Sequence, residues 1–301
     1  RWEKVEAWEA GFETNMFRNR LHLEGVFYKK NTKDLLAKVP GISGTIPGIG
    51  NLGEIRNSGV ELAATWRDQI GDWGYSVSAN LTTISNKVKS LVQEGYSIIA
   101  GDKNQSYTMA GYPIGYFYGY KVDGVYQSPA DIEASPKNTL ATVTPGDLKF
   151  ADVNGDGKIT PEDRTMIGDP TPDVTYGMTL GVSYKNWDLS IEMMGQGGNQ
   201  IYRTWDNYNF AQFNYMEQRL DRWHGEGTSN SQPLLNTKHA INRENSEYYI
   251  ESGRFFRIRN LQLAYTFDQT LIAKIRLQAL RVYFNAQNLK TWKHNTGYTP
   301  E

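Results

Sequence analysis

The sequence predicts an all-β protein built from antiparallel hairpins. Four pairs of segments carry large apolar side chains at every second position, with small or polar residues between them. The 301 residues also include 19 Tyr, 8 Trp and 29 Gly, a composition that suits strands and turns better than helices. Alternation with a period of two is the pattern of a pleated strand with one apolar and one polar face.

The clearest predicted hairpin lies between residues 176 and 193 and turns at Lys185 and Asn186. Small or polar residues such as Thr179 and Ser190 separate its apolar positions. Those apolar positions are Tyr176, Met178, Leu180, Val182 and Tyr184 in the first strand, and Trp187, Leu189, Ile191 and Met193 in the second. The alternation through both strands predicts a wall that is apolar on one side and polar on the other.

Three further hairpins follow the same pattern, which brings the expected number of strands to at least eight. Their strand pairs are 8–12 with 21–28, 60–66 with 75–81, and 260–267 with 280–287. The turns within hairpins are short. The connections between hairpins, at about 29–57, 86–173 and 195–253, are much longer than those of most compact domains.

Short turns at one end of a sheet and long loops at the other are typical of transmembrane β-barrels, whose strands need ~9–11 residues to cross the bilayer. A soluble β-sandwich is the alternative, because its inner face also alternates. The consistent side assignment across eight strands favours the barrel. The chain begins within a strand pattern and stops just past a strand, so we expect it to be part of a longer polypeptide.

Composition and motifs exclude several classes of function. The chain has 32 Lys and Arg against 33 Asp and Glu, so no excess of positive charge favours a nucleic-acid partner. It has no Cys, which excludes a disulfide scaffold and a thiolate nucleophile. No apolar run reaches the ~18 residues of a membrane-spanning helix. The scattered histidines form no metal or triad motif, and we expect no enzyme.

One turn, at residues 152–163, matches the spacing of an EF-hand-type calcium loop, in which alternate oxygen ligands converge on one ion. Gly157 occupies the position of the sharp turn, and Asp163 replaces the usual Glu at the last position. The expected ligands are Asp152, Asn154, Asp156, the backbone carbonyl of Lys158, Thr160 and Asp163. The spacing predicts a structural Ca²⁺ site; the alternative is an Asp/Asn/Gly turn that binds no ion.

Several segments, in order along nearly the whole chain, carry further motifs. They are 146–160 with 163–164, 167–170 and 172–173, and 2–3, 33–36, 51–62, 119–128, 256–267, 288–292 and 297–301. Together these segments closely resemble the SusC/RagA family of TonB-dependent outer-membrane transporters. The resemblance implies that residues 1–301 are the C-terminal portion of a plugged barrel of about 22 strands, with the 152–163 loop inside a long extracellular loop.

The resemblance also implies a function and partners. It implies import of glycan oligosaccharides or peptides across the outer membrane, driven through TonB, with a SusD-like lipoprotein on the outer face. The family's signal peptide, TonB box and plug would lie upstream of this chain, and its final strand would follow Glu301. The alternative is a calcium-stabilised soluble β-domain used in surface adhesion or scaffolding.

Aromatic residues in the long connections are the candidate ligand contacts, because aromatic rings stack on sugar rings. The substrate-binding candidates are Tyr116, Tyr118, Trp205 and Tyr208. Membrane-interface belts and packing beneath a lipoprotein are the alternative roles for such residues. Trp73 and Trp187, beside short turns, are predicted belt residues. Polar residues of the strands, Asp188, Glu192 and Gln262, are predicted to face the barrel interior.

Overall fold

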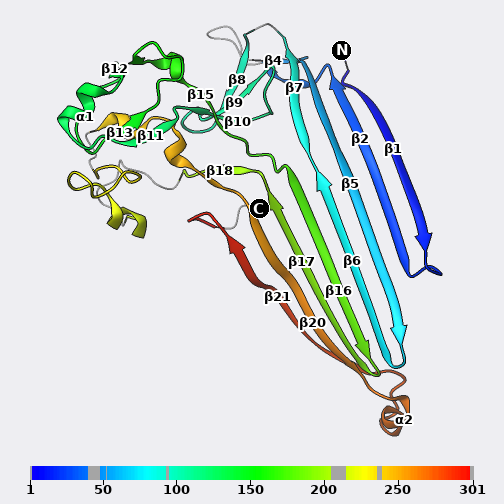
Figure 1. The fold of residues 1–301 in the computed structure, drawn as a ribbon. Coiled ribbons are helices and arrows are strands. Elements are labelled where there is room, and N and C mark those ends of the chain that lie inside the picture. Colours follow the sequence, from blue (N-terminus) through cyan, green and yellow to red (C-terminus); the bar gives the residue numbers. More distant parts are fainter. Residues whose placement is uncertain are drawn as a thin grey trace.

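The fold is one long antiparallel sheet with a packed assembly of loops at one end. The computed structural model describes residues 2–39, 48–51, 53–92, 95–204, 215–235 and 239–298. The long strands follow each other in the order β1, β2, β5, β6, β16, β17, β20 and β21 (Figure 1). Their bounds are β1 Lys4–Met16, β2 Leu21–Lys33, β5 Gly53–Ile70, β6 Trp73–Thr83, β16 Val174–Tyr184, β17 Trp187–Gly197, β20 Phe255–Thr266 and β21 Arg281–Lys293. The four predicted hairpins are therefore confirmed.

The connections divide the sheet into two ends (Figure 1). Residues 17–20, 71–72, 185–186 and 267–280 form the turns at one end, while 84–173 and 198–254 form the long connections at the other. The long connection predicted at 29–57 is shorter than expected, because β2 and β5 extend into it. Polar residues dominate both strands there, with Ile55 as the apolar exception, so the alternation that marks a strand disappears from the sequence.

The register places all predicted apolar positions on one face of the sheet, the apolar face. One row across it runs from Leu21 through Trp66, Val77, Leu180 and Ile191 to Leu261 and Ala286. The neighbouring row on the opposite face, the polar face, runs from His22 through Thr65, Ser78, Thr179 and Glu192 to Asn260. The predicted interior residues Asp188, Glu192 and Gln262 belong to this polar face.

No second sheet covers the apolar face within the described residues. Leu62 keeps 46% of its surface exposed, and Phe284 keeps 66%. A sandwich would bury these side chains in its core. The predicted facing is confirmed, and the soluble-sandwich alternative is wrong, because the apolar side chains that would form its core meet no partner layer.

Aromatic rings mark both ends of the apolar face. At the turn end, Trp73 packs on Tyr184 with ring centroids 4.4 Å apart, and Trp187 packs on Tyr265 at 4.8 Å. At the other end Tyr176 stacks with Phe256 at 6.4 Å. Tyr176 and Tyr184 lie on the same strand, which at ~3.4 Å per residue separates them by about 27 Å. That span matches the ~25 Å apolar band of outer-membrane barrels.

Short elements make up the remaining connections. β7 (Ser85–Leu91) extends the large sheet beside β5, and no helix in the described residues is long and apolar enough to cross a membrane. The short strands are β3 (Leu36–Val39), β4 (Gly48–Asn51), β8 (Ser97–Ala100), β9 (Ser106–Met109), β10 (Tyr116–Gly119), β11 (Val122–Val125), β12 (Lys137–Asn138), β13 (Leu148–Phe150), β14 (Lys158–Ile159), β15 (Thr165–Gly168), β18 (Gln200–Tyr202) and β19 (Ile250–Ser252). The helices are α1 (Pro129–Ala134), α2 (Gln269–Ile272), η1 (Pro161–Asp163), η2 (Glu217–Asp221), η3 (Ala240–Arg243), η4 (Glu247–Tyr249) and η5 (Ala273–Ile275).

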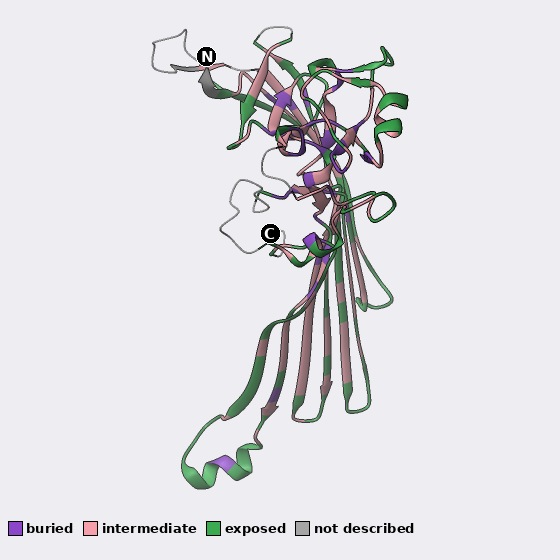
Figure 2. Cartoon of the chain, turned by 90° about the vertical axis from the view of Figure 1, so that its left-hand side faces the viewer, coloured by how far each residue is buried: buried purple, intermediate pink, exposed green. Residues whose placement is uncertain are grey.

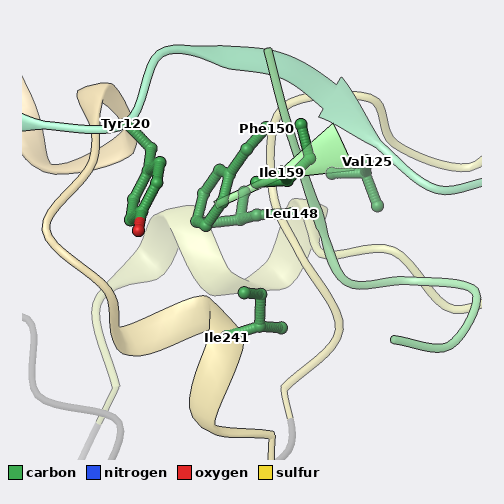
Figure 3. Packing of buried hydrophobic residues seen from close by; sticks show 6 residues of the cluster. All are labelled: Tyr120, Val125, Leu148, Phe150, Ile159 and Ile241. Atoms are coloured by element: carbon green, nitrogen blue, oxygen red, sulfur yellow. The ribbon is translucent and has the colours of Figure 1, made fainter. Parts of the chain in front are cut away.

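The described parts of residues 95–173 and 199–254 pack into a compact unit, the loop assembly. Most buried residues of the molecule lie there, whereas the strands below are half-buried or exposed (Figure 2). Its main cluster consists of Tyr120, Val125, Leu148, Phe150, Ile159 and Ile241 (Figure 3). Tyr120 and Phe150 stack face to face, with centroids 4.7 Å apart and planes at 6°. The loop assembly thus has a hydrophobic core of its own.

A buried polar network joins the two halves of the loop assembly. The Asn242 side chain donates to Asp147 Oδ1 at 2.9 Å and accepts from the Leu148 N–H at 2.8 Å, and both side chains are buried. His239 also contacts Asp147, with Nδ1 2.7 Å from Oδ1. The two segments are 95 residues apart in sequence. At Gly119 the backbone lies so close to the Asn245 carbonyl that any Cβ would clash with it.

Candidate functional site

The polar face of the sheet offers a continuous hydrophilic wall. Small and hydroxyl side chains dominate it, and Arg281 of β21 lies 3.6 Å from Asp188 of β17. A depression of about 490 Å³ has Thr65, Asn80, Glu192 and Arg259 among its lining residues. Such a wall exposes hydrogen-bonding groups to a solvated interior, as the lumen of a barrel requires.

The first predicted ligand contact, Tyr116, is a packing residue in this structure. Its side chain is 1% exposed, its ring stacks on Tyr112 at 4.8 Å, and its hydroxyl donates to Met109 Sδ at 3.8 Å. Burial raises the pKa of Tyr116 to about 12, because the surroundings disfavour a phenolate. Tyr116 therefore supports the neighbouring rings and presents no open face of its own.

The second predicted contact, Tyr118, lines a polar cavity of about 310 Å³ in the loop assembly. Its ring packs on Tyr107 with centroids 4.4 Å apart, and both tyrosines border the cavity. Arg164 enters the same cavity and pairs with Glu244 at 3.1 Å. The combination offers ring faces, a guanidinium and a carboxylate, which together suit a ligand rich in hydroxyl, amide or acid groups.

The other two predicted contacts, Trp205 and Tyr208, lie outside the described residues. The segment just before them is held by Arg203, whose buried side chain pairs with Glu251 at 3.2 Å and lies 4.8 Å from the Tyr248 ring. Sequence reasoning singled out neither Arg203 nor Glu244. Their partners come from distant segments, and no local spacing signals such a contact.

The predicted calcium loop is organised by its own side chains. Asp152 accepts hydrogen bonds from the N–H groups of Gly155 at 2.7 Å and Gly157 at 2.8 Å. Asn154 accepts from the Asp156 N–H at 2.9 Å, and Asp156 accepts from the Lys158 N–H at 2.8 Å. Gly155 and Gly157 have φ of 75° and 80°, which makes them suited to this tight turn.

Asp163 differs from the other acidic groups because it is fully buried. Its carboxylate accepts from the N–H of Thr160 at 2.7 Å and of Val153 at 2.9 Å. Burial raises the pKa of Asp163, but these hydrogen bonds outweigh it and hold the pKa below its usual range. The carboxylate therefore fastens the end of the loop to its beginning.

The donor set partly fits a calcium ion. Asp152, Asn154 and Asp156 lie at or near the surface and keep lone pairs free for a cation, whereas Asp163 is committed to backbone N–H groups. Within the described residues, no group of three His, Cys, Asp or Glu side chains is gathered closely enough to hold a metal by itself. Calcium binding at this loop remains a prediction.

Comparison with known proteins identifies the family. A family model described as the β-barrel of TonB-dependent receptor-like proteins matches residues 1–289. The chain belongs to this family. TonB-dependent receptor P3 of Formosa agariphila is 29% identical over all of this chain and 31% of its own length. The TonB-dependent receptor SusC of Bacteroides thetaiotaomicron is 27% identical over all of this chain and 30% of its own length.

Solved structures agree on the fold. The RagAB peptide transporter matches 99% of this chain and 32% of its own chain, with a TM-score of 0.80 and 24% identity. The same importer in a closed state matches with a TM-score of 0.77 and 25% identity. This chain thus spans about a third of the length of the relatives it matches.

Family membership indicates how the two faces and the two ends of the sheet lie relative to the outer membrane. TonB-dependent receptors of the SusC and RagA type are outer-membrane receptors and transporters, not enzymes. The apolar face therefore meets lipid and the polar face meets the barrel interior. In such barrels the short turns lie in the periplasm and the long loops outside the cell. We propose that the loop assembly is accordingly the outward-facing part of this chain.

Proposed function

We propose that this chain forms part of the barrel wall of an importer for oligosaccharides or peptides. The importer is energised through TonB and works with a SusD-like lipoprotein on its outer face. The observation that carries the proposal is the pairing of an uncovered apolar face with a continuous polar face in a chain of the SusC and RagA type. The similarity to RagAB, a peptide transporter, supports peptides as one of the two ligand classes.

Ligand contact is proposed for Tyr118 in the outward-facing cavity, with Arg164 beside it as a donor to hydroxyl, carbonyl or carboxylate oxygens. Trp205 and Tyr208 keep their proposed contact role, and Tyr116 supports the neighbouring rings of Tyr107 and Tyr118. The loop assembly is rigid enough to hold such contacts in place, because its own core and the Asp147–Asn242 bond connect its segments.

Uptake by the full-length protein in its host tests the proposal. Cells are supplied with labelled oligosaccharide and peptide mixtures, and the protein, TonB or both are deleted. Loss of uptake of one class in each deletion supports the proposal. Uptake that persists without TonB would indicate a passive pore and contradict it. Affinity purification of the tagged protein from outer membranes should recover a lipoprotein in stoichiometric amount; a transporter purified alone would contradict that partnership.

We also propose that the 152–163 loop binds Ca²⁺ as a structural ion. Asp152, Asn154 and Asp156 would supply side-chain oxygens, with the Lys158 carbonyl and Thr160 completing the set; Asp163 fastens the loop behind them. An affinity of ~10⁻⁴–10⁻³ M would suffice outside the cell. Isothermal titration should detect one binding event that Asp156→Ala removes and Glu133→Ala, on nearby α1, retains. Unchanged calcium uptake in Asp156→Ala would refute this site.

A further inference from the structure

The connection between β20 and β21 differs from the other turns at its end of the sheet. Residues 17–20, 71–72 and 185–186 are tight turns without a helix. The β20–β21 connection instead contains α2 and η5, which follow each other without a break from Gln269 to Ile275. This helical segment projects beyond the ends of the strands (Figure 1). A barrel turn needs no helix to reverse the chain, so the segment calls for another explanation.

The segment carries an apolar face that no described part of the chain covers. Leu271 and Ile275 are 54% and 63% exposed, and their spacing of four residues places them on the same side of the helix. Ile272, on another side of the helix, is only 3% exposed. Leu277, just past the helix, is also exposed. Three of the four Leu and Ile residues in 269–277 are therefore exposed, and only Ile272 is buried.

This apolar face continues the lipid-facing surface of the barrel. The outward row of β20 runs through Leu261, Leu263 and Tyr265, and Phe267 follows just past the end of the strand, two residues before α2 begins. Tyr265 packs on Phe267 at 4.9 Å and belongs to the aromatic belt at the periplasmic end. Such belts lie at the level of the lipid headgroups. The helix therefore begins at the periplasmic membrane surface.

The charges of the segment are also arranged for a headgroup layer. Lys274 and Arg276 are exposed beside the apolar face, while the acidic Asp268 accepts a hydrogen bond from the Asn186 side chain at 2.8 Å. Exposed apolar residues next to basic residues are the pattern of a helix that lies in a membrane interface. Its aliphatic side enters the acyl boundary and its cations remain among the phosphates.

We propose that α2 and η5 form an interfacial anchor in the periplasmic leaflet. Leu271 and Ile275 insert at the boundary between headgroups and acyl chains. Lys274 and Arg276 bind the phosphates of anionic phospholipids. The anchor fixes the depth and tilt of the β20–β21 hairpin in the membrane. At the three tight turns, aromatic residues alone serve this purpose. Lipid is the occupant of the apolar face because the face continues the lipid-facing row and its charges complement anionic headgroups.

A single-site probe tests the occupant directly. This chain has no Cys, so Ile275→Cys introduces one attachment point in the full-length protein once any cysteine elsewhere in it is replaced. The protein is labelled there with an environment-sensitive fluorophore and placed in vesicles of phosphatidylcholine and phosphatidylglycerol. Ala273→Cys, exposed on the opposite side of the same helix, is the matched control. We expect lipid-attached quenchers to quench position 275 several-fold more than position 273.

Two outcomes would overturn the anchor. Equal quenching at both positions would show that the helix stays in water. A label at 275 that neither lipid quenchers nor aqueous iodide reach would show that another part of the protein covers the face. Lys274→Gln with Arg276→Gln should abolish the gain in quenching that phosphatidylglycerol produces, whereas Lys137→Gln in the loop assembly should not. A gain that survives the paired substitution would contradict the role of the two cations.

Discussion

The sheet and the loop assembly place the same residue types in opposite environments. Phe284 of β21 is 66% exposed, whereas Phe150 of the loop assembly is 1% exposed. Leu148 is fully buried, while Leu62 on the apolar face keeps 46% of its surface exposed. In water both sets would have to be buried. Only a sheet whose solvent is hydrocarbon can leave its largest apolar side chains uncovered.

This difference shows that two physical effects stabilise the chain. The loop assembly lies in water and gains stability by burying apolar surface in its own core. The sheet gains little from contacts between its apolar side chains, because lipid tails are as apolar as leucine. It depends on backbone hydrogen bonds that have no competing water. Substitutions should therefore have different effects in the two regions.

The largest effect is expected in the core of the loop assembly. Phe150→Ala removes a buried ring that stacks on Tyr120 and should destabilise the loop assembly by about 3–5 kcal/mol. Protease added to intact cells should then cut within residues 95–254, while the barrel keeps its heat-modifiable migration on gels. Phe150→Leu, which retains most of the volume, is the control. If the loop assembly of Phe150→Ala resisted the protease, its hydrophobic core would not be the main source of its stability.

A charge on the lipid face should have the next largest effect. Leu180→Arg, near the middle of β16, should destabilise the barrel by about 2–4 kcal/mol, because the guanidinium would lie in hydrocarbon. Thr179→Arg, one residue away on the polar face, is the matched control and should cost far less. Urea unfolding of the full-length protein in lipid vesicles measures both. Equal costs for the two variants would contradict the assignment of the faces.

Acid should weaken the turn that Asp163 closes. The pKa of Asp163 is lower in the folded than in the unfolded chain. Its contribution to the stability of the loop is therefore complete above the unfolded pKa of ~3.9, and it is lost as the pH falls through the lower pKa of the folded state. Asp163→Asn should cost the loop about 1–3 kcal/mol at neutral pH and flatten this acid dependence. Pepsin cleavage rates at residues 152–163 across the acidic range report both effects. An unaltered acid profile in the variant would assign the dependence to other carboxylates.

The smallest effect is expected for a simple truncation on the lipid face. Leu180→Ala leaves no cavity, because a lipid chain fills the space, so stability in vesicles should change little. The matched truncation Leu148→Ala in the loop assembly should cost about 2–5 kcal/mol. Unfolding curves of the two variants, measured in the same full-length background, show whether truncation costs less on the lipid face than in the loop assembly. Similar losses would mean that the apolar face packs against protein.

The sequence alone determined the strands, the hairpins and the separation of an apolar from a polar face. These features are local, because side-chain alternation is a property of each strand and the register of a hairpin follows from its short turn. The tight turn within residues 152–163 was predictable for the same reason, since neighbouring residues such as Asp152 and Gly157 close their own turn. The burial of the Tyr116 side chain was not visible in the local sequence, because it depends on how the loop assembly packs.

Tertiary structure decided how the long connections pack. Ile241 completes a core with Leu148, and Asn242 bonds to Asp147, although about ninety residues separate the two segments. Arg164 meets Glu244 and Tyr118 around one cavity in the same way. No periodic pattern marks such contacts, because each depends on the folding of two distant loops against each other. A contact between residues that are close in sequence can be predicted from the sequence. A contact between two distant loops cannot, because it forms only when the whole chain folds.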